Sequence, residues 1–112
     1  MSTATAQGPL LPFRLESVQH RALGRLLRLS LADDLLVLAL TPEEAFSLAL
    51  ALAAVCDGMR REHGLYLSPI ASDRAFDARI EADGVAIALD SGELHLDWPQ
   101  VAALAALLGE AV

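Results

Sequence analysis

The segment LALTPEEAFSLALALAAVC, residues 38–56, joins the end of an apolar strand to the start of a long apolar helix. The Thr41 hydroxyl can accept a hydrogen bond from the otherwise unpaired N–H of Glu44. The Glu44 side chain can return the bond, and a proline fills the first helical position. Acidic residues in the first turn also suit the positive end of the helix dipole. We therefore predict a helix over about 41–62, with Gly64 just past its end.

This helix has more apolar surface than one sheet can cover, since Ser47 is the only polar residue from Ala45 to Val55. At 3.6 residues per turn, one apolar stripe faces the sheet. A second stripe is left over, and it consists of Phe46, Leu50, Ala53 and Ala54. The final helix leaves Leu107 over in the same way. A surplus apolar face indicates packing against another helix of the same chain or against a partner. Between these two explanations we favour a homodimer, the commonest symmetric assembly.

The residues before this helix alternate between apolar and polar in the manner of strands. We predict a first strand at 13–17 and a second from Leu26, with Leu27, Leu29 and Leu31 on one face. Residues 35–40 are apolar on both faces. That pattern is typical of a central strand covered on both sides, and we predict such a strand here.

The second half of the chain repeats this order of elements. A short extended piece at 65–67 precedes alternating residues at 76–82, 85–89 and 94–96, with tight turns at Asp83-Gly84 and Ser91-Gly92. Asp97 and Gln100 can form a second capping box, which predicts a final helix over about 97–110. The fold class expected is α+β: two strand–strand–(strand)–helix units with a mainly antiparallel sheet packed against two helices.

Residues 29–56 can be aligned with residues 85–112 without a gap. In this alignment the helix caps, the turns and the inward-facing strand positions coincide. Thr41 falls on Asp97, and Glu44 falls on Gln100. This agreement fits an internal duplication. It equally fits two unrelated hairpin–helix units, because the same physics imposes the same caps and turns on both.

Composition indicates one globular domain. The chain has 112 residues, of which 54% are hydrophobic, and a formal net charge of −7. We expect a flexible tail at 1–9 and a single domain at 10–112. The acidic balance argues against binding to nucleic acid or to an anionic membrane face, and it suits a basic partner. All eight basic residues are arginine and asparagine is absent, as expected for a GC-rich, bacterial genome.

Localisation is predicted from the cysteine content and the apolar runs. A single cysteine, Cys56, cannot form an intramolecular disulfide, and the first residues do not resemble a secretory signal. The longest apolar run is shorter than the roughly 20 residues that a membrane span requires. We therefore expect a soluble cytoplasmic protein, with Cys56 as a buried structural thiol.

One basic patch stands out, because residues 1–32 hold four of the eight arginines and one of the fifteen acidic residues. His20, Arg21, Arg25 and Arg28 are weak candidates for an anion site. The simpler explanation is that this patch faces an acidic part of the same protein or of a partner copy. The cations at 60–63 complement the predicted helix C-terminus.

The segment Glu93-x-His95-x-Asp97 offers three metal-ligand side chains on one strand face. Alternate residues of a strand lie about 6.6–7 Å apart, so three in a row cannot converge on one ion. Asp97 is also needed as a helix cap. We therefore expect a solvated strand face, with no metal and no cofactor.

The chain contains no phosphate-binding glycine loop, no Cys-x-x-Cys, no His-Glu-x-x-His and no Gly-x-Ser-x-Gly motif. We expect a non-enzymatic protein–protein interaction module: an adaptor, a chaperone or an inhibitor. The alternative is a small enzyme or ligand-binding protein whose pocket, at a dimer interface, uses His20, His63, His95 and the arginines. In size, charge and strand–helix order the chain resembles the small acidic α+β dimers among bacterial secretion chaperones, although their leading helix has no counterpart here.

Overall fold

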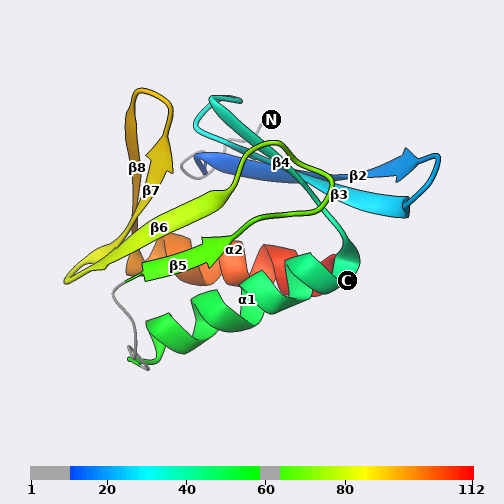
Figure 1. Ribbon diagram of the computed structural model, residues 1–112. Coiled ribbons are helices and arrows are strands. Elements are labelled where there is room, and N and C mark those ends of the chain that lie inside the picture. The colour runs from blue at the N-terminus through cyan, green and yellow to red at the C-terminus, as the bar shows by residue number, and fades with distance from the viewer. Residues whose placement is uncertain (1–10, 59–63) are drawn as a thin grey trace, which may run out of the picture.

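The computed structural model describes residues 11–58 and 64–112. Within these residues it contains two antiparallel sheets and two helices, which confirms the predicted α+β class (Figure 1). The elements in chain order are β2 (Phe13–His20), β3 (Gly24–Leu31), β4 (Leu36–Leu40), α1 (Pro42–Cys56), β5 (Gly64–Leu67), β6 (Phe76–Glu81), β7 (Gly84–Leu89), β8 (Gly92–Asp97) and α2 (Trp98–Glu110).

Three strands, β2-β3-β4, form one sheet, and four strands, β5-β6-β7-β8, form the other. In the first sheet Leu29 pairs with Leu15 on one side and with Leu38 on the other. In the second sheet Val85 and Ile87 are fully buried, as their alternation predicts. Each sheet therefore presents one apolar face to the interior.

The two helices lie side by side in one layer, and both sheets stand on the same side of them (Figure 1). A single cluster of buried side chains draws on both sheets and both helices. The helices pack closely because small residues meet between them: a methyl group added at Gly109 would lie 3.9 Å from the Ala49 Cβ. None of the described helices is both long enough and apolar enough to cross a membrane.

Both predicted capping boxes are present. The Thr41 hydroxyl accepts from the Glu44 N–H at 3.1 Å, and the Thr41 N–H donates to Glu44 Oε1 at 2.9 Å. Asp97 and Gln100 repeat the arrangement at the start of α2, with distances of 2.9 and 3.0 Å. These short-range bonds satisfy N–H groups that the first helical turn leaves free, so they fix where each helix begins.

The predicted end of the first helix, near residue 62, is wrong. The helix ends at Cys56, and Asp57 is its C-cap. Gly58 follows with φ +86°, a left-handed conformation that glycine adopts readily and that stops a helix. Gly64, predicted to lie just past the helix, instead begins β5. Residues 59–63, with the predicted last-turn cations, lie outside the described part of the chain.

The prediction of a central strand at 35–40, covered on both faces, is also wrong. This segment forms β4, which is an edge strand of its sheet. Alternate leucines of β4 are buried, but Val37 is exposed. The outer edge is closed by Ser72, whose hydroxyl accepts from the Ala39 N–H at 2.7 Å and donates to the Ala39 carbonyl at 3.1 Å. One side chain thus satisfies backbone groups that a neighbouring strand would otherwise bind.

The structure contains two strand–strand–strand–helix units, with β5 between them. Placing residues 29–56 on 85–112 puts β4 on β8 and α1 on α2. The earlier strands agree less well, because four residues connect β3 to β4 while two connect β7 to β8. The agreement is closest at the helix caps, which any strand–helix unit needs. An internal duplication and two unrelated units with the same local requirements therefore both stay open.

Candidate functional site

The outer side of the helix layer carries a groove between α1 and α2, with a volume of about 420 Å³. Small side chains line its floor, and Phe46 and Leu50 stand along the α1 side. We call it the helix groove; its lining residues are Phe46, Ala49, Leu50, Ala53, Cys56, Asp57, Ala102, Ala105, Ala106 and Gly109. Among the described residues of this lining, Asp57 is the single charged one.

The surplus apolar stripe of α1 is left open by α2. The side chains of Phe46 and Leu50 are 48% and 56% exposed, respectively. Ala49 of α1 and Ala105 of α2 both border the groove and are buried. Because the neighbouring α2 residues, Ala102 and Ala106, are short, they cannot reach across the groove to cover the larger side chains.

Three of the five predicted interface residues come together in the helix groove: Phe46, Leu50 and Ala53. Ala54 is half-buried and does not line the groove. Leu107 lies on another side of α2. It is half-buried against the core and borders a separate hollow with Leu15 and Leu27. The structure therefore separates Leu107 from the other candidates.

Cys56 lies at one end of the helix groove, half-buried, with its Sγ 4.0 Å from the Trp98 carbonyl oxygen. Burial, and to a lesser degree the Asp57 carboxylate, raises the pKa of this thiol. Both effects disfavour the thiolate, which is the nucleophilic form. This environment fits a structural thiol.

The four residues of the predicted anion site engage different neighbours. His20 Nδ1 accepts from the backbone N–H groups of the β2–β3 turn at 3.1 and 3.0 Å. Arg25 donates to Ser17 and to the Ala111 carbonyl oxygen, while Arg28 pairs with Glu16 at 3.0 Å. Arg21 is exposed in the turn.

Strand alternation separates these arginines further. Arg25 and Arg28 differ by three positions along β3, so their side chains project from opposite faces. The structure does not assemble the patch into one anion site.

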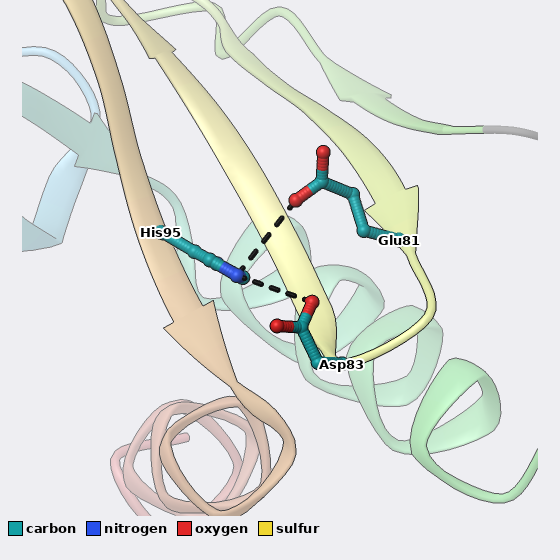
Figure 2. A group of neighbouring side chains, drawn as sticks. All are labelled: Glu81, Asp83 and His95. Atoms are coloured by element: carbon teal, nitrogen blue, oxygen red, sulfur yellow. Dashed lines mark ion pairs between the residues drawn. The ribbon is translucent and has the colours of Figure 1, made fainter.

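A polar cluster that the sequence did not predict joins His95 to two carboxylates. His95 Nε2 lies 3.3 Å from Asp83 Oδ1 and 3.7 Å from Glu81 Oε1. In Figure 2 the His95 ring, on β8, points toward both carboxylates, one at the end of β6 and the other in the β6–β7 turn. The three candidate ligand atoms all lie within 4.8 Å of one another. We call these residues the His95 cluster.

Strand register brings the cluster together. Ala86 of β7 pairs with Arg79 on one side and with His95 on the other. Its methyl group is small enough for longer side chains of β6 and β8 to approach each other above it. The tight turn at Asp83-Gly84 then places Asp83 beside the face of the sheet that carries Arg79 and His95.

Arg79 orients one carboxylate of the cluster. It donates to Glu81 Oε2 at 2.9 Å and to Glu93 Oε2 at 2.8 Å. Its hydrogen bond lowers the pKa of Glu93, and the two carboxylates together raise the pKa of Arg79. Because Arg79 engages Oε2 of Glu81, Oε1 is left to face His95.

In the Glu93-x-His95-x-Asp97 segment, Asp97 behaves as predicted, and the exposed Glu93 forms an ion pair that the sequence did not predict. Asp97 caps α2, and Glu93 pairs with Arg79. His95, however, lies next to two carboxylates, Glu81 and Asp83, from the β6–β7 hairpin. A usable signal was present in the sequence, because the Asp83-Gly84 turn sets the pairing of β6 with β7 and the Ser91-Gly92 turn sets that of β7 with β8. Only the two pairings together place His95 in the row of Arg79.

Comparisons of the chain with protein-family models, with curated proteins and with solved structures give no match.

Proposed function

We propose that this chain is a non-enzymatic protein–protein interaction module, of the adaptor, chaperone or inhibitor type, that binds through the helix groove and uses it to form a homodimer. The observation that carries the proposal is the exposure of Phe46 and Leu50 beside a groove of alanine and glycine. Large exposed apolar side chains grouped in this way are typical of interaction surfaces.

The groove suits a second copy of the same chain because it is complementary to itself. A two-fold axis brings identical patches face to face, so each copy must offer both a projection and a hollow. Phe46 supplies the projection, and the hollow is lined by Ala102, Ala106 and Gly109. A buried phenylalanine contributes roughly 150–250 Å² of contact area, which gives such an interface a strong anchor.

The proposal includes a cytoplasmic location and a protein partner in addition to the second copy. A single cysteine, which cannot form an intramolecular disulfide, suits a reducing compartment. The net charge of −7 favours a basic protein partner over nucleic acid.

The alternative, a pocket built from histidines and arginines, has less support. His20 lies in the three-stranded sheet, His95 lies in the four-stranded sheet, and the arginines of β3 point to opposite faces. His63 is outside the described residues.

Sedimentation velocity tests the dimer directly. We expect the unchanged protein to sediment as a dimer, and Phe46→Glu or Leu50→Glu to shift it toward the monomer, because each places a charge in an apolar contact. Leu35→Glu is the matched control: Leu35 is 60% exposed, lies in the β3–β4 connection and is outside the groove. This control should remain dimeric.

Circular dichroism spectra of all the variants should match that of the unchanged protein, so that a loss of the dimer is not a loss of fold. An unchanged protein that sediments as a monomer across the whole concentration range would overturn the homodimer.

A further inference from the structure

We infer that Glu81, Asp83 and His95 form a binding site for a divalent transition-metal cation of the zinc class. The three side chains come from β6, the β6–β7 turn and β8, and they converge on one exposed point of the sheet (Figure 2). This site is separate from the helix groove and does not depend on the proposed function.

Separations within the cluster match those of ligands around one ion. Nitrogen and oxygen ligands lie about 2.0–2.2 Å from Zn²⁺, so two ligands of a tetrahedral site lie about 3.3–3.6 Å apart. His95 Nε2 lies 3.3 Å from Asp83 Oδ1 and 3.7 Å from Glu81 Oε1. The Glu81 and Asp83 oxygens lie within 4.8 Å of each other, and rotation of these accessible side chains can bring them together around a cation.

The same separations are long for direct ion pairs. A charge-assisted hydrogen bond between a protonated imidazole and a carboxylate is about 2.7–2.9 Å long. Both His95 contacts exceed that length, although all three side chains are accessible enough to move closer. These separations leave room for the three groups to share a cation in place of a direct hydrogen bond.

The ligand types select the class of metal. Imidazole nitrogen favours Zn²⁺ and its first-row neighbours over Mg²⁺ and Ca²⁺, which prefer sites made entirely of oxygen. Two carboxylates supply the negative charge that offsets a divalent ion. Three protein ligands leave at least one position for water or for a group from another molecule.

Neighbouring residues support the ligands in the way that the surroundings of a metal site do. Arg79 holds Glu81 through Oε2 and leaves Oε1 facing the site. A guanidinium so close would repel a cation, but Glu93 pairs with the same group at 2.8 Å and offsets its charge. Hydrogen bonds of this kind to ligating carboxylates commonly stabilise metal binding.

Calorimetric titration of the tag-free full chain with Zn²⁺ tests this site. We expect binding of one ion per chain, and a loss of at least tenfold in affinity in each of two variants, His95→Ala and Asp83→Asn.

Spectroscopy tests the kind of metal and the ligand. Co²⁺ should bind with visible absorbance bands typical of low coordination number, and a tenfold excess of Mg²⁺ should not displace the bound Co²⁺. In nuclear magnetic resonance spectra, Zn²⁺ should shift the imidazole signals of His95.

Control variants separate this site from general charge and from other histidines. Asp77→Asn removes an exposed carboxylate from the same face of β6, and His20→Ala and His63→Ala remove the other imidazoles. All three should bind Zn²⁺ with unchanged affinity. The inference is overturned if the unchanged protein takes up no Zn²⁺, or if His95→Ala and Asp83→Asn bind it as the controls do.

Discussion

The reactivity of the Cys56 thiol depends on the residues around it. It sits where the end of α1 approaches the start of α2, half-buried and next to the Asp57 carboxylate. Because burial and this charge raise its pKa above the roughly 8.5 of a free cysteine, we expect it to react slowly with iodoacetamide at pH 8. The measurement is the alkylation rate between pH 7 and 10, in the folded protein and in urea.

The folded protein should reach half its maximal alkylation rate at a higher pH than the urea-unfolded chain. Since the folded pKa is the raised one, this thiol adds stability that is complete below the unfolded pKa and is lost as pH rises through the folded pKa. Asp57→Asn should move the folded midpoint down toward the unfolded one. A folded midpoint at or below the unfolded midpoint would contradict the assigned environment.

The polar residues were harder to predict from sequence than the apolar ones. The surplus apolar stripe that contains Phe46 and Leu50 follows from helical periodicity, which is a local property. By contrast, the meeting of His95 with Glu81 and Asp83 depends on the register of three strands. The sequence indicates that each of these side chains faces solvent, but the row that each one joins follows only when the pairings set by the two turns are combined.

Two capping boxes of the same design allow a comparison between elements. In α1 the Glu44 carboxylate accepts from Thr41 through Oε1 and also from the Ile70 N–H through Oε2, at 3.0 Å. In α2 the corresponding Gln100 accepts from Asp97. We expect Gln100→Ala to lower the free energy of unfolding by about 1 kcal/mol, and Glu44→Ala to lower it by about 1 kcal/mol more. Urea unfolding of both variants measures the difference.

Glu44→Gln provides the control for this comparison, because an amide oxygen can keep the bond to Thr41 but cannot serve both donors as a carboxylate does. Its loss of stability should lie between zero and that of Glu44→Ala. Equal losses for Glu44→Ala and Gln100→Ala would show that the bond to Ile70 contributes nothing to stability.

Helix starts could be predicted to within a residue because the caps are local sequence patterns, as Thr41 and Asp97 show. The end of α1 could not. Asp57-Gly58 stops the helix, but apolar Met59 and the following arginines prolong the apparent pattern beyond it. The edge position of β4 was missed because apolar character predicts burial and does not specify neighbouring strands; Ser72, far along the chain, closes that edge.

At the scale of the whole molecule, bonds and packing cross between the two strand–helix units. Arg25 of β3 donates to the Ala111 carbonyl oxygen at the end of α2, at 2.6 Å. Ser72, which precedes β6, binds the edge of β4. The buried cluster also contains leucines of the first unit together with Phe76 and Leu104 of the second. Neither unit encloses its own core, so the two units should fold together.

Cooperative unfolding is the consequence that can be measured. Trp98 lies in the second unit, packs against the shared core and donates to the Ala82 carbonyl oxygen, so its fluorescence reports on that unit. Leu29 is fully buried in the first unit. We expect Leu29→Ala to lower the free energy of unfolding by about 2–5 kcal/mol, as large-to-small core substitutions do. In urea, Trp98 fluorescence and far-ultraviolet circular dichroism should report one and the same shifted midpoint, at equal protein concentration. The milder Leu29→Val should shift both midpoints together by less.

Two independent domains would behave differently. The fluorescence midpoint would stay where it is in the unchanged protein, while the dichroism transition would split into two steps. That result would refute the single domain at 10–112.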